Sequence, residues 1–223
     1  MDQNKKTAII LGATGLTGGI LLQLLLEDDR YDKIKLFSRN RVNIVSDKIE
    51  EHIGDVLNLE GFKPKFKADE VFCCIGTTNS KTPDKELYHK IDFGIPVTAA
   101  QMCSKQGIEK LLVISALGAD ANSSIFYNRV KGEMEEAVLK MGISKTYILQ
   151  PSLISGPREE RRPGEWLAKQ LFKVLNVFMV GPLRKYRSIH PKEIAICMLK
   201  LANGEEASGR ITSDEITIIA NHD

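Results

Sequence analysis

Two groups of residues in this 223-residue chain could do chemistry. The first is a glycine turn in which Gly12, Gly15 and Gly18 recur at three-residue spacing. The second is Tyr127 with Lys131 four residues further on. A glycine turn ahead of a helix can bind a phosphate group. A phenol near an ammonium can exchange a proton with a carbonyl or alcohol oxygen. Both groups depend on elements that must bring them together.

The glycine turn joins an apolar run at residues 7–11 to an apolar helical run at residues 20–26. Its first glycine allows a tight turn, its second lets the backbone approach a pyrophosphate, and its third lets helix and strand pack closely. We count Thr14, Leu16 and Thr17 among the cofactor contacts, because the helix N-terminus offers free N–H groups to an anion. The spacing differs from the commoner G-x-G-x-x-G, and glycine turns also occur without a ligand.

The tyrosine and lysine share one face of a predicted helix. A phenol with an ordinary pKa near ~10 is a poor proton donor or acceptor at neutral pH. The ammonium of Lys131 and the positive nicotinamide ring favour the phenolate and lower the pKa of Tyr127 toward the working range. The lysine can also hold the nicotinamide ribose. By itself this spacing is common by chance, and a solvated helix face is then the default interpretation.

Ser115 is the third candidate catalytic residue. It stands at the end of an apolar run, twelve residues before Tyr127. A hydroxyl at that point can hydrogen-bond a substrate carbonyl oxygen and polarise it for hydride attack.

Apolar runs alternate with helical patterns along the chain. Strands are predicted at residues 7–11, 33–38, 50–53, 70–75, 110–115 and 145–150. Helices are predicted at residues 15–26, 84–105 and 124–141, with a short turn near 56–61. Strands that alternate with helices form a parallel sheet covered on both faces. We therefore expect an α/β fold with a doubly wound parallel sheet.

The chain is expected to form a single domain over residues 1–223, in which residues 151–223 supply a small substrate-binding region with pocket and lid. Pro151 leaves the sixth predicted strand and is expected to pass the nicotinamide. Residues 163–165 are predicted to open an amphipathic helix, and residues 194–201 to form another.

The end of the second predicted strand indicates which dinucleotide is bound. A protein that prefers NAD places an acidic side chain there, on the ribose hydroxyls. This chain has Ser38 and Arg39 instead, with Arg41 close by. A hydroxyl and a planar cation suit a 2′-phosphate. NADP(H) is favoured and NAD(H) stays possible, because both arginines could also be solvated loop charges.

Further cofactor contacts are expected where two other strands end. Asp55 and Val56 follow the third predicted strand, where a loop can cover the adenine. Ile75, Gly76 and Thr77 follow the fourth, where a small residue lets the backbone pass the cofactor. Open α/β sheets bind their ligands at these carboxyl ends.

Composition excludes several other classes of protein. Hydrophobic residues make up 43% and charged residues 27%, with a net charge of +2, which favours a small-molecule substrate over nucleic acid. No apolar run reaches the ~18 residues of a membrane span, so no membrane partner is expected. The four cysteines lack zinc spacing, so no metal is predicted. The first residues lack a secretory pattern, which predicts a cytoplasmic protein, either monomer or homodimer.

Three segments together resemble a known family. They are C-I-G-T-T at residues 74–78, Y-x-x-V-K-G-E at 127–133 and R-P-G-E-W-L at 162–167. With the glycine turn and Ser115, they resemble the short-chain dehydrogenase/reductase superfamily in its atypical branch, and more narrowly the Tat-interacting-protein oxidoreductases. The resemblance implies an NAD(P)-binding Rossmann fold and a catalytic set of Ser115, Tyr127 and Lys131.

One departure from the family pattern concerns the serine. Relatives often carry consecutive serines at this strand end, whereas Ser115 is followed by Ala116 and Leu117. If the working hydroxyl belongs one or two places later, this chain has no hydroxyl there to hold the substrate oxygen.

Two functions remain open on the sequence alone. The first is an NADPH-dependent reductase of a carbonyl compound, which could also oxidise the alcohol. The second is a regulator with little or no catalysis that senses NADPH and binds a protein partner. A hydrolase is disfavoured, because the chain lacks a G-x-S-x-G turn.

Overall fold

The computed structural model describes residues 5–78, 80–155 and 181–222. The strands are β1 (Lys6–Leu11), β2 (Tyr31–Ser38), β3 (Ile49–Ile53), β4 (Glu70–Cys73), β5 (Lys110–Ile114), β6 (Lys145–Gln150) and β7 (Gly209–Thr212). The α-helices are α1 (Leu16–Glu27), α2 (Lys85–His89), α3 (Ile95–Gln106), α4 (Phe126–Leu139), α6 (Pro191–Asn203) and α7 (Ser213–Asn221). Shorter helical turns are η1 (Val56–Phe62), η2 (Lys90–Gly94) and η3 (Gly181–Tyr186).

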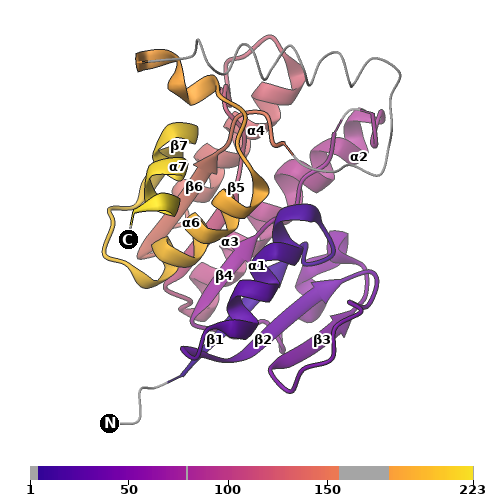
Figure 1. Cartoon of the computed structure of the whole chain (residues 1–223). Coiled ribbons are helices and arrows are strands. Elements are labelled where there is room, and N and C mark those ends of the chain that lie inside the picture. Colours follow the sequence, from indigo (N-terminus) through magenta and orange to yellow (C-terminus); the bar gives the residue numbers. More distant parts are fainter. Residues whose placement is uncertain (1–4, 79, 156–180, 223) are drawn as a thin grey trace.

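All seven strands join one parallel sheet in the order β3-β2-β1-β4-β5-β6-β7 (Figure 1). The order reverses between β1 and β4, since the chain builds outward from β1 to β3 and then returns to β4. In such doubly wound sheets the reversal creates a crevice at the carboxyl ends of the strands, where ligands bind.

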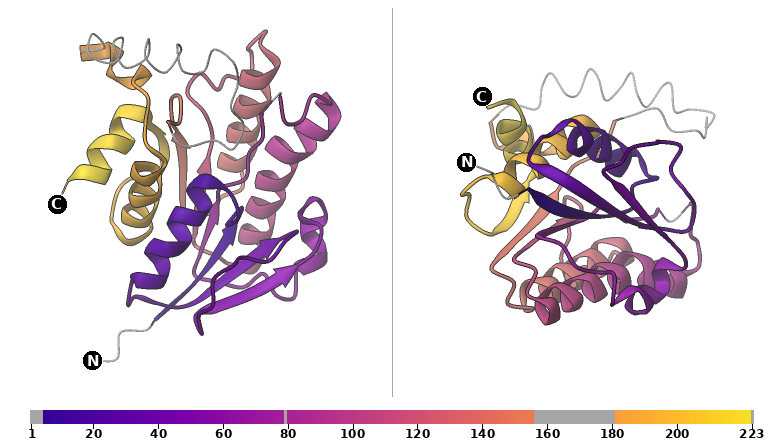
Figure 2. Two further views of the ribbon diagram at one scale, coloured as in Figure 1. Left: turned by 45° about the vertical axis from the view of Figure 1, so that its right-hand side comes forward. Right: turned by 90° about the horizontal axis from the view of Figure 1, so that it is seen from below.

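Helices cover both faces of the sheet, as the view from below in Figure 2 shows. Helices α1, α6 and α7 pack on one face, and their apolar residues form one buried cluster with the sheet. Helices α3 and α4 pack with η1 on the other face and form a second cluster. A sheet buried on both sides explains why its strands are apolar runs without strict alternation.

The predicted fold class is confirmed, and each of the six predicted strands is present. Three elements of the tail were not predicted, namely η3, β7 and α7. Strand β7 has only four residues and a half-buried pattern, so it carries little periodic signal. It pairs with β6 and extends the same sheet at its edge. The helix predicted to open at residues 163–165 lies outside the described residues.

The predicted helix over residues 84–105 is interrupted rather than continuous. Helix α2 leads into η2, a π-helical turn, and then into α3. Such a turn inserts an extra residue into a helix and is frequent at functional sites. Here it contains Asp92, which is fully buried.

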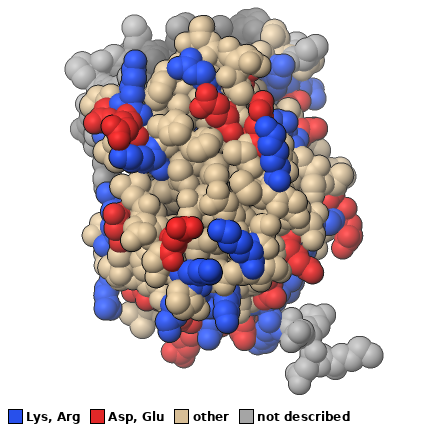
Figure 3. Space-filling view, turned by 180° about the vertical axis from the view of Figure 1, so that it is seen from behind, with Lys and Arg blue, Asp and Glu red and all other residues tan. Residues whose placement is uncertain are grey.

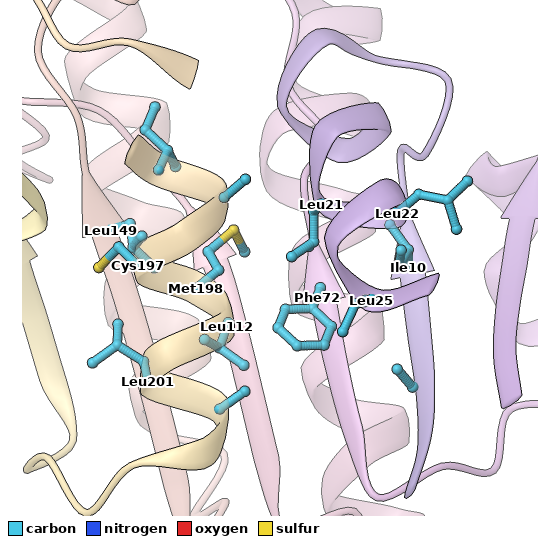
Figure 4. Packing of buried hydrophobic residues seen from close by; sticks show 14 of the residues in the cluster. Ile10, Leu21, Leu22, Leu25, Phe72, Leu112, Leu149, Cys197, Met198 and Leu201 are labelled. Atoms are coloured by element: carbon cyan, nitrogen blue, oxygen red, sulfur yellow. The ribbon is translucent and has the colours of Figure 1, made fainter. Parts of the chain in front are cut away.

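Phe72 lies at the centre of the first cluster. Its ring sits on the sheet between α1, which contributes Leu21 and Leu25, and α6, which contributes Met198 (Figure 4). All four side chains are fully buried. This packing fixes α1, and with it the glycine turn, against the middle of the sheet.

Acidic and basic side chains interleave on the face of the molecule opposite to that of Figure 1 (Figure 3). That distribution agrees with the small net charge of +2. It gives this face no field of one sign to attract a polyanion.

Phe72→Ala should lower the free energy of unfolding by about 3–5 kcal/mol, because it removes a fully buried ring and leaves a cavity. Urea denaturation followed by circular dichroism measures the loss. Val45→Ala is the control, since that side chain is fully exposed and should change the value little. An equal loss in both variants would contradict the packing described here.

Candidate active site

The glycine turn has the geometry that a phosphate cradle needs. Gly12 has a φ of +89°, and its carbonyl accepts a hydrogen bond of 3.0 Å from the N–H of Gly15. A Cβ on Gly18 would overlap the Gly12 carbonyl, so only glycine lets the strand and helix approach this closely. A Cβ on Gly12 would lie 3.0 Å from the carbonyl oxygen of Cys74, which places the turn directly beside the end of β4.

Helix α1 begins at Leu16 without a side-chain cap on its described N-terminus. Its leading N–H groups are therefore free of a side-chain partner and point toward the turn. Thr14, Gly15 and Leu16 are exposed, whereas Thr17 is buried. The backbone of the turn, more than its side chains, offers donors to an anion.

The residues expected at the second strand end are brought to the same edge of the sheet. Arg39 and Arg41 are exposed. Ser38 is buried, and its Oγ donates a hydrogen bond of 2.6 Å to the carbonyl of Asn40. The serine proton is thus used within the protein, while the guanidinium of Arg39 faces solvent.

Asp55 and Pro151 both accept hydrogen bonds that stabilise the fold. Asp55 caps η1, because its Oδ1 accepts a hydrogen bond of 3.0 Å from the N–H of Leu57. The carbonyl of the buried Pro151 accepts one of 2.9 Å from the N–H of Leu117 and thereby ties the loops after β6 and β5 together. Val56, in η1, is half-buried.

A buried ion pair connects α4 to η2. The Lys131 Nζ lies 2.8 Å from Asp92 Oδ1, and their side chains are 3% and 0% exposed. Burial is the largest single influence and lowers the pKa of Lys131, but the charge of Asp92 and its hydrogen bond, together with smaller contributions from Tyr127 and Cys73, raise it by more. The pKa of Lys131 therefore lies above its ordinary value, and the side chain is an ammonium at neutral pH.

Asp92 also holds the loop after β4. Its second oxygen, Oδ2, accepts a hydrogen bond of 2.9 Å from the N–H of Thr77. A Cβ on Gly76 would lie 3.5 Å from Asp92 Oδ1 and 3.6 Å from Lys131 Nζ, so the glycine backbone covers the ion pair. Ile75 precedes it and is half-buried. The loop after β4 thus meets α4 through one carboxylate.

Asp92 was not identified from the sequence. The available signal was a single acidic residue between the apolar Ile91 and Phe93, within a predicted helix. Carboxylates are almost never fully buried unless they are paired, so such a residue requires a cation or several donors nearby. The pairing itself depends on the π-helical turn, which the sequence pattern did not reveal.

Tyr127 lies in the first turn of α4, one turn before Lys131, and is half-buried. Its ring centroid is 5.9 Å from that of Tyr88, with the planes inclined by 66°. Gly132 allows α4 to lie against the preceding loop, because a Cβ there would overlap the backbone of Asp120 and Ala121. The helix start that carries the phenol is therefore held closely against the end of the β5 loop.

The hydroxyl of Ser115, expected to bind a substrate oxygen, makes a hydrogen bond within the protein. Its Oγ donates a hydrogen bond of 2.5 Å to Oε1 of Glu135, which is fully buried. The same carboxylate accepts from Gln150 at 3.0 Å and from Arg210 at 2.6 Å. A serine has one proton to donate. In this arrangement that proton joins β5 to α4 and is not available to a substrate oxygen.

Among the described residues, no group of three or more His, Cys, Asp or Glu side chains is arranged to hold a metal ion. Nor is any described helix long and apolar enough to cross a membrane.

The comparison with protein families decides the assignment. Residues 12–162 match the family described as NAD(P)H-binding, which is more than half of the chain. The chain belongs to the NAD(P)H-binding family. The matched region runs from the first glycine of the turn past the Tyr127–Lys131 pair, so it includes both groups of residues with which the sequence analysis began.

Curated relatives of this NAD(P)H-binding protein narrow the family. It is 31% identical to Protein HTATIP2 of Rattus norvegicus over 171 residues, covering 75% of this chain and 70% of the relative. It is 34% identical to the mitochondrial Protein fmp52 of Aspergillus niger over 165 residues, covering 70% of each. The predicted membership of the atypical short-chain dehydrogenase/reductases is confirmed.

The names of these relatives also correct one prediction. The fungal relatives from Aspergillus niger and from Candida glabrata, the latter 30% identical over 202 residues, with 89% of this chain and 86% of the relative covered, are both named mitochondrial. The expectation of a cytoplasmic protein is therefore wrong. It rested on the lack of a secretory pattern, and that pattern does not distinguish the cytoplasm from an organelle.

Solved structures share the fold at low sequence identity. The enzyme WbmH of Bordetella bronchiseptica in complex with NAD+ superposes with a TM-score of 0.69 at 15% identity, over 93% of this chain and 75% of that one. UDP-glucose 4-epimerase of Thermotoga maritima gives 0.68 at 13% identity, over 96% and 81%. These likenesses show a Rossmann-type fold.

Lys131→Met should lower the free energy of unfolding by about 3–5 kcal/mol, because it leaves the Asp92 carboxylate buried without its cation. The double variant Lys131→Met/Asp92→Asn should recover much of that loss. The difference between wild type and Lys131→Met should be full below pH 10.5, the ordinary lysine value, and fade as the pH rises through the raised pKa.

The control for this pair is Lys90→Met. It removes one partner of the exposed Lys90–Glu86 pair, with contact at 2.8 Å, and should change stability little. Additive losses in the Lys131/Asp92 double variant, measured by urea unfolding, would show that the two groups do not interact.

Proposed function

We propose that this NAD(P)H-binding protein is an NADPH-dependent reductase of a carbonyl compound, able also to oxidise the corresponding alcohol. The observation that carries the proposal is the buried Lys131–Asp92 pair one helical turn from Tyr127. A lysine that only solvates a helix surface is exposed, whereas the ammonium of Lys131 is buried. A positive charge close to a phenol stabilises the phenolate, which favours proton exchange by Tyr127.

The residues present fit the cofactor. The positive φ of Gly12 and the close approach at Gly18 form a cradle that a Cβ would fill. The N-terminus of α1 would bind the pyrophosphate, Asp55 and Val56 would border the adenine, and Ile75, Gly76, Thr77 and Pro151 would line the passage to the nicotinamide. When bound, the reduced nicotinamide supplies a hydride to the carbonyl carbon.

In the proposed reaction Tyr127 donates its phenolic proton to the carbonyl oxygen, which becomes the alcohol hydroxyl. Lys131 stabilises the phenolate that this leaves, and its ammonium also grips the nicotinamide ribose. Asp92 keeps the lysine charged and fixes its position. The phenolate then takes a proton from solvent, which restores the starting state.

The oxygen-binding role of Ser115 stays a prediction. It requires the hydroxyl to turn away from Glu135 and give up a hydrogen bond to a buried carboxylate. Such a bond to a charged group contributes about 1.5–3 kcal/mol, which opposes the change.

Tyr127→Phe should lower turnover by on the order of 10²–10⁴-fold, because it removes the proton donor. The dissociation constant for NADPH should change little. The assay is NADPH oxidation with a panel of aldehydes, ketones and quinones, and Tyr186→Phe, at an exposed position, is the matched control. Wild-type turnover in Tyr127→Phe would reject this mechanism.

Arg39→Ala should weaken NADPH binding by about 1.5–3 kcal/mol, on the order of tenfold to a hundredfold in Kd, because it removes the cation proposed for the 2′-phosphate. Binding of NADH, which lacks that phosphate, serves as the internal control and should stay unchanged. Fluorescence titration measures both constants. An unaltered ratio of the two affinities would remove Arg39 from the phosphate site.

A second candidate function is a regulator that senses NADPH, binds a protein partner and turns over little. The bond from Ser115 to Glu135 favours it, because the expected oxygen-binding hydroxyl is occupied. Similarity to HTATIP2 is compatible with either function. Capture of a partner that depends on NADPH, without oxidation of any carbonyl in the panel, would support the regulator over the enzyme.

A further inference from the structure

The hydroxyl of Tyr88 is a buried polar group without a partner. Tyr88 lies in α2, its side chain is 2% exposed, and its Oη is closed to solvent. Within the described part of the chain it makes no hydrogen bond. Buried hydroxyls nearly always have a partner, so an orphaned one calls for a functional explanation.

The surroundings of Tyr88 connect it to the proposed active site. Its ring packs edge-to-face against Tyr127, with centroids 5.9 Å apart, and against Phe126, with centroids 5.6 Å apart. Tyr88 is also four residues before Asp92, the partner of Lys131. The orphaned hydroxyl therefore belongs to the residues that surround the proton donor.

Tyr88 remains a donor at every working pH. Burial raises its pKa above the ordinary value, and the negative charges of Asp92 and of Tyr127 in its phenolate form raise it further. A phenol in this environment keeps its proton when its neighbour Tyr127 loses one. It can polarise an oxygen but does not compete as the acid.

A carbonyl oxygen that gains negative charge during hydride transfer needs a second donor besides the acid. The serine expected to supply it gives its proton to Glu135. The next two residues, Ala116 and Leu117, have no hydroxyl. The phenol of Tyr88 is the one buried hydroxyl of the described residues that lacks a partner.

We propose that Tyr88 is a catalytic residue whose hydroxyl donates a hydrogen bond to the substrate carbonyl oxygen, in the role predicted for Ser115. This inference rests on the proposed reductase function. The substrate oxygen would enter between the two phenols, take a proton from Tyr127 and accept a hydrogen bond from Tyr88. No bond at Tyr88 breaks, so atoms and charge balance as in the reaction described above.

The test is Tyr88→Phe, which keeps the ring and removes only the orphaned hydroxyl. Since no hydrogen bond within the protein is lost, the melting temperature should stay the same or rise. The Kd for NADPH should stay within about twofold, whereas kcat for carbonyl reduction should fall on the order of 10²-fold, the usual loss for one donor to an oxyanion.

Ser115→Ala is compared with Tyr88→Phe, because Ser115 is the alternative donor to the substrate oxygen. Ser115→Ala should lower the melting temperature, because Glu135 loses a donor, and it should lower kcat by less than Tyr88→Phe does. A wild-type kcat in Tyr88→Phe would overturn the inference, as would a large fall in kcat confined to Ser115→Ala. A lowered melting temperature in Tyr88→Phe would reveal a partner inside the protein and would also overturn it.

Tyr127→Phe, run in parallel, separates this inference from the function on which it rests. An inactive Tyr127→Phe beside a fully active Tyr88→Phe removes only the role of Tyr88. A fully active Tyr127→Phe, or a wild type that reduces no carbonyl in the panel, removes the reductase function and the role of Tyr88 together.

Discussion

An ammonium and a carboxylate 2.8 Å apart, both shielded from solvent, fix how helix α4 meets the end of β4. Breaking such a pair on one side leaves a buried charge, so the two side chains hold each other in place. Asp92 adds the N–H of Thr77 to the same contact. The position of Lys131, and through it the electrostatic environment of Tyr127, follows from that contact.

The sheet positions the Lys131–Asp92 pair close to the glycine turn, where we propose that a dinucleotide binds. Gly12 lies beside the carbonyl of Cys74, and Gly76, two residues later, lies over the ion pair. The phosphate cradle and the ammonium are therefore linked through one short loop after β4. Because α1 is packed on the centre of the sheet by Phe72 and its neighbours, the distance between cradle and ammonium is set by the hydrophobic core.

The polar side chains around Ser115 hydrogen-bond to one another and hold structural elements together. Glu135 accepts hydrogen bonds from Ser115, Gln150 and Arg210, and so joins the ends of β5 and β6, together with β7, to α4. A fully buried carboxylate with donors on several elements is costly to disturb. Ser115 is therefore held in a structural role by Glu135. The chain shares its architecture with its family, but fold alone does not determine which residues act in catalysis.

Much of the fold was predictable because its signals are local. The apolar runs that became β1, β4 and β5, and the glycine turn after β1, are contiguous in the sequence. Strand β7 was missed because four residues, three half-buried and one exposed, leave no period to detect.

The site was predictable only in part. The types and spacing of Tyr127 and Lys131 point to proton transfer, and geometry was not needed to select them. The partners of Lys131 and Ser115 were not predictable. Asp92 lies 39 residues before its lysine and faces it only through a π-helical turn, and Glu135 faces Ser115 only because α4 crosses the end of β5. Long-range pairing of single polar residues has no periodic signature.

A crystal structure of the protein with NADPH tests the central claim most directly. We predict the pyrophosphate at the N-terminus of α1 and a nicotinamide ribose hydroxyl in hydrogen-bond contact with Lys131, with Asp92 still paired with the ammonium. An ordered cofactor whose ribose does not touch Lys131, or a lysine that has left Asp92 to reach it, would contradict the account.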